Sequence, residues 1–371
     1  MKITDVTLKL FKWEGLPEVS THLVRRKPGE VHDLGLVTIH TDEGIEGHSF
    51  LGKQIEFASS DAASLIRYLK PVLIGEDPMN RERLFRAIWR RRRLSSIRAV
   101  GALDVALWDL VGKILGAPVW QILGGFREKV PVYCSSDHLP SPSAYAEEAL
   151  KFKEMGWHGY KIHTHGPWQD HIRVCEAVRN AVGSDPSFKL MMDSIFLYDF
   201  PTALRVGRAL EEMDYYWYED PLGDQDIYNY VKLKQKLDIP IVATERPMAG
   251  FDSYAPWITA QATDYLRGDV AIKGGITTMM KTAHLAEAFG MNYEVHVGGN
   301  AVNNIANLHV ELAIANCEFH EIIMPYEGRH YGLTECPEVD AEGYIHAPNG
   351  PGLGLSVDHE LIGRNLIAEL K

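Results

Sequence analysis

The stretch Tyr215-Tyr216-Trp217-Tyr218-Glu219-Asp220-Pro221 is the part of the sequence that decides the fold. A short run of aromatic residues, typical of a buried strand, ends there on a carboxylate. Two similar runs flank it along the chain, so that the carboxylates Asp193, Glu219 and Glu245 are 26 residues apart. This is close to the length of one strand–helix unit, and the sequence therefore predicts a repeated βα architecture.

Eight short apolar segments follow this rhythm, and each precedes a helical stretch or a loop. The predicted strands are Val130–Ser135, Gly159–His163, Phe188–Asp193, Tyr215–Glu219, Ile239–Glu245, Asp264–Asp269, Asn292–His296 and Phe319–Glu321. Eight such strands favour an α/β fold, a parallel (β/α)8 TIM barrel. A barrel of this kind needs roughly 250 residues, which leaves about 120 of the 371 residues for a second part.

The beginning of the chain has a different pattern, strands first and helices afterwards, which predicts an α+β capping domain. The expected elements are a strand at Ile3–Leu10, a hairpin of Leu34–His40 and Ile45–Phe50, a helix at Phe57–Leu69 and a buried helix at Ala99–Leu115. We expect the cap over residues 1–125, the barrel domain over 126–330 and a C-terminal segment, 331–371, that packs back on the cap.

Composition limits the class of protein. Lys and Arg total 38 and Asp and Glu total 50, a net charge of −12, which disfavours general binding to nucleic acids or anionic membranes because these partners are polyanions. The four cysteines are far apart and form no CxxC pair, so no disulfide framework is predicted. We find no leader peptide and no membrane span in the sequence, and expect a cytoplasmic enzyme.

Ionisable residues end the predicted barrel strands from the second strand onward. They are Lys161, His163, Asp193, Glu219, Glu245, Asp269, His296 and Glu321. The active site of a parallel barrel lies at the carboxyl ends of its strands. Any one of these groups alone would more often be a helix cap or a solvated loop residue. Because they end successive strands, we expect them around one mouth.

Asp193, Glu219 and Glu245 end adjacent strands, where three anions would repel one another and be costly to bury. A divalent cation removes both costs. A ligand set made only of carboxylates favours Mg²⁺, with Mn²⁺ as a possible substitute. Three separate structural ion pairs are the alternative interpretation.

Proton-transfer groups are expected on either side of these carboxylates. Lys161 and His163 are two residues apart on one strand and point the same way, and a lysine beside a second cation can act as a base. Asp269 can fix the imidazole tautomer of His296 on the next strand. Glu321 can hydrogen-bond a substrate oxygen, best if protonated, and Glu318 is an alternative for that role.

The order and spacing of several motifs resemble the enolase superfamily, in particular its mandelate racemase subgroup, over nearly the whole chain. The motifs are Ala102–Asp109 with Gly112-Lys113 and Leu123-Gly124-Gly125, Lys161-Ile162-His163, Glu219-Asp220-Pro221, Thr244-Glu245, Asp269 through Gly274-Gly275-Ile276-Thr277 to His296, and Pro351-Gly352-Leu353-Gly354.

By this resemblance the three carboxylates would bind Mg²⁺. Lys161 would be one acid/base, His296 with Asp269 the other, and Glu321 would contact the substrate carboxylate. The common step of the family removes the proton α to a carboxylate. The family also implies a homo-oligomer.

One motif departs from the family, because His163 stands where the KxK strand has its second lysine. The sequence therefore leaves open whether Lys161 or His163 is the base. The polar segments after the first two barrel strands favour a hydroxyl-rich substrate. Ser136 and His165 from these segments, with His22, Arg25 and Arg26 from the loop Leu16–Val31 of the cap, are candidate substrate contacts.

We expect dehydration of a sugar acid, an aldonate or aldarate, to a 2-keto-3-deoxy acid. A racemase, epimerase or cycloisomerase that uses the same site is the main alternative. His163 and His165 form an HxH motif of the kind found in metal-dependent amidohydrolases. The next three strands end in carboxylates, which disfavours that class of enzyme. A non-enzymatic binding protein would not need this set of residues. The basic stretch Arg81–Arg98 is read as a solvated helix face or a subunit contact.

Overall fold

The computed structural model describes the chain except residues 16–30, 247–248, 327 and 329. Its N-terminal part contains an antiparallel sheet of four strands in the order β13-β1-β2-β3. The strands are β1 (Ile3–Trp13), β2 (His32–Thr41), β3 (Gly47–Leu51) and β13 (Leu366–Leu370). The hairpin of β2 and β3 is as predicted, and β1 is longer than expected because its ladder with β2 continues to the pair Trp13 and His32.

The end of the chain returns to this first sheet. β13 pairs antiparallel with β1, from Leu8 opposite Leu370 to Phe11 opposite Leu366, and helix α13 (His359–Arg364) precedes it. This confirms that the C-terminal segment completes the cap. The domain boundaries at residues 125 and 330 stay predictions.

Helices cover one face of the cap sheet. They are α1 (Ser59–Ser64), the π-helical turn η1 (Leu65–Leu69), the 3-10 turn η2 (Lys70–Val72), α2 (Arg81–Trp89), α3 (Ile97–Leu115) and α4 (Val119–Ile122). The Ser96 hydroxyl caps α3 by accepting from the amide of Ala99, and Gly116 ends it in the left-handed conformation. Leu103, Leu107 and Leu110 of α3 are fully buried in the same apolar cluster as residues of the sheet, as the apolar sequence predicted.

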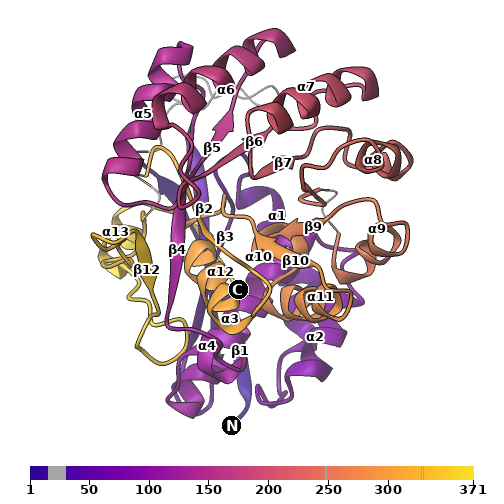
Figure 1. Cartoon of the computed structure of the whole chain (residues 1–371). Coiled ribbons are helices and arrows are strands. Elements are labelled where there is room, and N and C mark those ends of the chain that lie inside the picture. Colours follow the sequence, from indigo (N-terminus) through magenta and orange to yellow (C-terminus); the bar gives the residue numbers. More distant parts are fainter. Residues whose placement is uncertain (16–30, 247–248, 327, 329) are drawn as a thin grey trace.

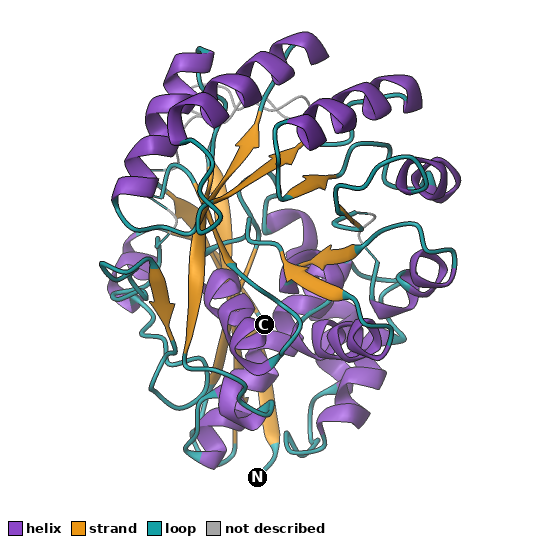
Figure 2. Cartoon of the chain, in the orientation of Figure 1, coloured by secondary structure: helices purple, strands orange, loops and turns teal. Residues whose placement is uncertain are grey.

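Parallel strands with helices outside them form the barrel (Figures 1 and 2). The strands are β4 (Lys129–Ser135), β5 (Gly159–His163), β6 (Lys189–Asp193), β7 (Trp217–Glu219), β8 (Ile241–Ala243), β9 (Tyr265–Gly268), β10 (Asn292–Val295) and β11 (His320–Ile323). Their order is β10-β9-β8-β7-β6-β5-β4-β11, so β11 pairs with β4 and the barrel is nearly closed. A short strand, β12 (Tyr344–His346), adds antiparallel to β4. The predicted TIM-like barrel is confirmed.

The connecting helices follow the strands in chain order. They are α5 (Pro142–Glu154), α6 (Trp168–Val182), α7 (Phe200–Glu212), α8 (Ile227–Lys234), the 3-10 turn η3 (Phe251–Ser253), α9 (Ala255–Thr259), α10 (Val270–Lys273), α11 (Ile276–Ala288) and α12 (Ala301–Ala313). Glu245 and Asp269 lie just after β8 and β9 rather than within them. Asp269 has left its strand because its carboxylate caps α10, accepting from the amides of Ala271 and Ile272.

Every second side chain of a strand points into the barrel, so the inward side chains of neighbouring strands fill the interior in layers. Aromatic and aliphatic side chains form an apolar cluster inside it: Tyr133, Met191, Trp217, Val242 and Phe319. Residues two positions further along several strands carry the charges described below. This alternation is the reason that short strands ending on ionisable residues bring those residues together.

Buried polar contacts join the cap to the barrel. Asp104 of α3 accepts from the amide and hydroxyl of Thr277 and pairs with Arg81 at 2.7 Å. Within the cap, Arg98 of α3 pairs with Asp61 of α1 at 2.7 Å. The first and last arginines of the basic stretch, Arg81 and Arg98, thus form internal ion pairs, and the prediction of a solvated face is wrong for them. Arg90 and Arg93, in the middle of the stretch, are exposed.

The cysteines are free, as expected: Cys134, Cys175 and Cys317 are buried and Cys336 is half-buried. Among the described helices, none is long and apolar enough to cross a membrane.

His309 of α12 connects three parts of the chain. Its Nδ1 accepts from the Trp120 amide and its Nε2 donates to the Leu353 carbonyl. Burial lowers the pKa of His309 to about 4, so the folded protein binds this proton less readily than the unfolded chain, whose histidines have a pKa near 6.5. Its contribution to stability is therefore present above pH 6.5 and lost as the pH falls toward 4.

We predict that His309→Gln removes this pH dependence. Urea unfolding of the unsubstituted protein should lose about 2 kcal/mol more than that of the variant between pH 7 and pH 5. Equal losses in the two proteins would show that His309 is not the titrating group.

Candidate active site

A hollow of about 860 Å³, open to solvent, lies at the carboxyl ends of the barrel strands. It is lined by several of the predicted residues: Ser136, His163, Asp193, Glu245, His296 and Glu321. Three more residues lie just behind the lining. Lys161 and Asp269 form ion pairs with lining residues, and a carboxylate oxygen of Glu219 lies within 4.8 Å of those of Asp193 and Glu245. The structure therefore brings all eight strand-end residues to one mouth.

Asp193, Glu219 and Glu245 offer carboxylate oxygens that lie within 4.8 Å of one another. Asp193 and Glu219 are buried at neighbouring positions of β6 and β7. Among the described residues, the basic nitrogen atoms within 4 Å of Glu245 are His296 Nε2 at 3.7 Å and Arg246 Nε at 3.9 Å, both too far for a hydrogen bond. Three converging hard oxygen donors, one of them poorly compensated, fit a Mg²⁺ ion.

A closed ring of alternating charges lies directly behind these ligands. Lys161 Nζ is 2.9 Å from Glu219 and 2.7 Å from Glu321, and Arg267 pairs with the same two carboxylates. All four side chains are at most 1% exposed. Burial and Arg267 oppose the charge on Lys161, but the two carboxylates outweigh them and raise its pKa well above the usual value. Lys161 was expected to act as a base because a neighbouring cation lowers its pKa, and this arrangement shifts its pKa in the opposite direction.

Glu321 has the opposite shift. Burial favours its neutral form, but Arg267 and Lys161 hold its pKa well below the usual range. The amide of Val297 also donates to it at 2.9 Å. The expectation of a protonated carboxyl at Glu321 therefore conflicts with its surroundings.

His296 and Asp269 form the predicted pair, with 2.5 Å between Nδ1 and the carboxylate. Burial alone would raise the pKa of Asp269, but the hydrogen bond to His296 lowers it to about 2. Because Nδ1 of His296 is hydrogen-bonded to Asp269, Nε2 is the ring nitrogen that can contact a ligand in the hollow. Gly298 passes close over this ring, and a Cβ there would lie 2.6 Å from His296 Cε1.

His163 faces the hollow from β5. Its Nε2 is 2.9 Å from Asp193, its Nδ1 is 2.9 Å from the Ser136 carbonyl, and its amide donates to the Ser136 hydroxyl. Burial disfavours the imidazolium, yet Asp193 raises the pKa of His163 above its ordinary value. Ser136 thus holds the backbone and ring of His163.

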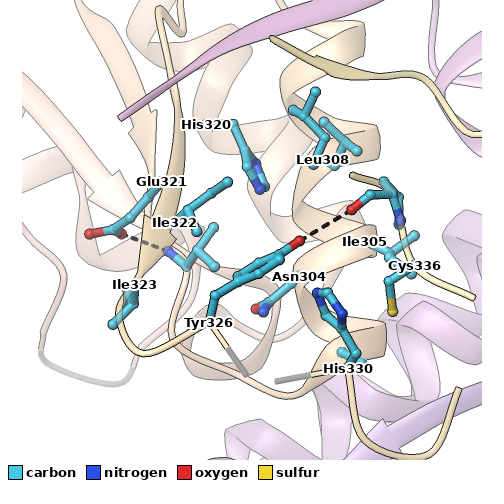
Figure 3. A pocket seen from close by; sticks show the side chains of 14 residues that line it. Asn304, Ile305, Leu308, His320, Glu321, Ile322, Ile323, Tyr326, His330 and Cys336 are labelled. Atoms are coloured by element: carbon cyan, nitrogen blue, oxygen red, sulfur yellow. Dashed lines mark hydrogen bonds between the residues drawn. The ribbon is translucent and has the colours of Figure 1, made fainter. Parts of the chain in front are cut away.

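A smaller, mainly apolar hollow lies on the other side of β11, between that strand, α12 and the C-terminal segment. Figure 3 shows the Glu321 side chain pointing away from Tyr326, His330 and Cys336, which occupy the opposite end of this hollow. Tyr326 donates to the Pro337 carbonyl there. Of these two hollows, the one at the barrel mouth therefore holds the converging carboxylates.

Three sets of residues predicted for the site are not found in the barrel mouth. His165 is exposed and packs against His138 with 5.0 Å between ring centroids, so His163 and His165 do not form a shared metal site. Glu318 is hydrogen-bonded to Tyr216, just before β7, and to Asn292, the first residue of β10, at the opposite end of the barrel. His22, Arg25 and Arg26 lie outside the described residues.

Sequence reasoning missed four cations near the mouth: Lys53, Arg246, Arg267 and Lys273. Arg267 left a signal, since it is a cation inside an otherwise apolar predicted strand, two residues before Asp269. Burial lowers the pKa of Lys273 to about 8. Lys53 follows a cap strand and has no periodic signal, because only folding brings the cap over the barrel.

Comparison with known proteins agrees with this geometry. A family model for the N-terminal domain of mandelate racemase and muconate lactonizing enzyme matches residues 22–124. A model described as enolase C-terminal domain-like matches residues 144–361.

The chain is also similar to characterised proteins along almost its whole length. It is 27% identical to an arabinonate dehydratase of Saccharolobus solfataricus, with 96% of each chain covered. It is 28% identical to a D-galactarolactone cycloisomerase of Agrobacterium fabrum, covering 88% of this chain and 89% of that one. The crystal structure of a D-glucarate dehydratase from Agrobacterium tumefaciens complexed with magnesium superposes with a TM-score of 0.87, 35% identity and coverage of 99% and 100%.

The three converging carboxylates, Asp193, Glu219 and Glu245, predict that the stability of the protein depends on Mg²⁺. Mg²⁺ at 100 times its dissociation constant should raise the free energy of unfolding by about 2.7 kcal/mol, since it binds only the folded chain. Glu245→Gln should abolish this gain, and titration calorimetry should show the loss of binding directly. Glu318→Gln, at the other end of the barrel, is the matched control and should bind Mg²⁺ normally; equal loss in both would refute the site.

The charge ring predicts a large effect of Arg267→Met. Removing one cation leaves two buried carboxylates undercompensated, which costs about 3–5 kcal/mol. Urea unfolding checks this against Arg208→Met on the exposed side of α7, for which a change within about 0.5 kcal/mol is expected. Similar values for the two variants would show that the ring does not stabilise the barrel.

Proposed function

Because this chain belongs to the mandelate racemase and muconate lactonizing group of the enolase superfamily, we propose that it is a Mg²⁺-dependent sugar-acid dehydratase. The product is a 2-keto-3-deoxy acid, and the substrate an aldonate or an aldarate. The observation that supports this most is the pair of histidines, His163 and His296, that face one hollow from different strands beside the carboxylates.

The proposed metal ligands are Asp193, Glu219 and Glu245. The bound ion supplies positive charge beside the substrate carboxylate, which makes the adjacent C–H proton easier to remove. The ring of Lys161, Arg267, Glu219 and Glu321 fixes the position of Glu219 without adding net charge. Glu321 also closes the wall beside Val297.

We assign the proton transfers to the side chains that line the hollow and can contact a bound substrate. His163 lines the hollow, whereas the Lys161 amine lies behind it in the charge ring, so we favour His163 as the base that takes the α-proton. Its Nδ1 donates to the Ser136 carbonyl, and its Nε2 would accept the proton when Asp193, which this nitrogen contacts here, instead binds the metal ion. On the β10 side, the Nε2 of His296 protonates the leaving 3-hydroxyl, which departs as water. Asp269 keeps the ring in the orientation that this step requires. The resulting enol tautomerises to the 2-keto acid.

A second candidate function uses the same two groups. With His163 and His296 on different sides, a proton can be taken from one face of a carbon and returned to the other, as a racemase or epimerase requires. A cycloisomerase among the relatives also favours keeping isomerisation open. Homo-oligomeric assembly and a cytoplasmic location likewise stay predictions.

A panel of aldonates and aldarates with Mg²⁺, assayed for 2-keto acid, tests the proposal. We expect one or more sugar acids to react, and His296→Asn to lower kcat by about 100-fold or more, since a general acid contributes about 10²–10⁴-fold. His163→Ala should abolish α-proton exchange in D₂O, whereas Tyr228→Phe, on the exposed surface, should behave as the unsubstituted protein.

Two outcomes would contradict the dehydratase. Deuterated epimer without keto acid would assign the isomerase. Retained exchange in His163→Ala with loss in Lys161→Ala would move the base to Lys161.

A further inference from the structure

The cap contributes a buried cation to the mouth that the reaction described above does not use. Lys53 lies two residues after the end of β3, lines the hollow and is only 4% exposed. Among the described residues no carboxylate lies within ion-pair distance of its amine. A buried ammonium without a counter-ion is costly, so this position indicates an anionic ligand.

The backbone around Lys53 is held from several sides. Asn300, at the start of α12, donates to the Gly52 carbonyl at 2.7 Å. The ring of His32 lies 2.7 Å from the Lys53 carbonyl, and Lys53 and Glu56 exchange two backbone hydrogen bonds. The backbone of this residue is therefore held over the barrel mouth by the contact between cap and barrel.

A second cation faces the same hollow from β8. Arg246 follows the ligand Glu245, lines the hollow and is about one-fifth exposed. Its single ion pair in the described part of the chain is the long contact of 3.9 Å to Glu245. Lys53, Arg246 and Glu245 all line this hollow, so both cations face the same space as this carboxylate.

A charge balance of the described part of the mouth leaves Lys53 without an ion-pair partner and Arg246 with only its long contact to Glu245. The ring of Lys161 and Arg267 with Glu219 and Glu321 is neutral, and a divalent ion offsets Asp193 and Glu245. Asp269 is paired with His296. On the wall there remain Lys53 and Arg246, with Asp137 as an acidic group after β4. A substrate with one carboxylate, bound at the metal, would leave this excess positive charge uncompensated.

We propose that Lys53 and Arg246 bind a second carboxylate of the substrate, remote from the reacting carbon, so that the substrate class is the dicarboxylic sugar acids, the aldarates. The proposal rests on the proposed function for the chemistry but makes its own claim about binding. Arg246 suits a carboxylate because its guanidinium offers paired donors.

Kinetics with two acids of one configuration tests the proposal. A hexarate and the corresponding hexonate differ only in a terminal carboxylate against a terminal hydroxymethyl group. We expect a higher kcat/KM for the hexarate, and Lys53→Met should lower that value by about 10- to 100-fold, as for a lost charged hydrogen bond, while changing the hexonate value by less than about threefold.

Lys53→Arg keeps the charge and should retain most of the hexarate preference, and Lys53→Gln serves if the methionine variant does not fold. Lys129→Met, an exposed lysine at the opposite end of β4, is the matched control and should leave both rates unchanged. Arg246→Met should shift the preference in the same direction as Lys53→Met. Equal loss for both substrates, or preference of the unsubstituted protein for the hexonate, would overturn the proposal.

Binding without turnover separates this inference from the proposed function. Calorimetry with Mg²⁺ should show that adipate, a non-reacting dicarboxylate, binds at least about tenfold more tightly than hexanoate, and that Lys53→Met removes the difference. If this holds while no sugar acid yields keto acid, the dehydratase is wrong and the subsite stands. If keto acid forms but adipate and hexanoate bind alike, the function stands and the subsite is wrong.

Discussion

The ring of ion pairs between Lys161, Glu219, Arg267 and Glu321 is the interaction on which the rest of the site depends. Each cation touches both carboxylates, and the four groups come from β5, β7, β9 and β11. Because every second strand supplies one charge, the ring holds the barrel in register at the level just below the mouth. It also solves a local problem, since Glu219 can be buried as an anion and still be presented to the hollow.

The mouth above this ring is made by two different parts of the chain. The barrel supplies the carboxylates and the two histidines, each at the end of a strand or just after it. The cap supplies the rim, through β3 and the turn that follows it, held by Asn300. This division suits an enzyme in which one set of residues performs the reaction and another selects the substrate, because the rim can change without disturbing the ring.

Sequence spacing predicted the barrel and most of the site for a definite physical reason. Parallel strands with a period of about 26 residues put equivalent positions at one edge, so Asp193, Glu219 and Glu245 had to converge once the strands were recognised. Strand ends were less accurate: Asp269 left β9 because its carboxylate caps α10. Protonation was predicted poorly, as Lys161 and Glu321 show. The groups that decide it are the carboxylates Glu219 and Glu321 for Lys161, and the cations Arg267 and Lys161 for Glu321, and these meet only in the folded chain.

The sequence by itself determined the strand period, the alternation that points residues inward and the kinds of groups that end the strands. These are local properties, fixed by neighbours in the chain. Only the tertiary structure decided which charges meet: that Lys161 lies in a ring while His163 faces the hollow, that Glu318 lies at the far end, and that Lys53 reaches the mouth from the cap. Electrostatic energy depends on distance and burial, and both are set by packing between segments remote in sequence.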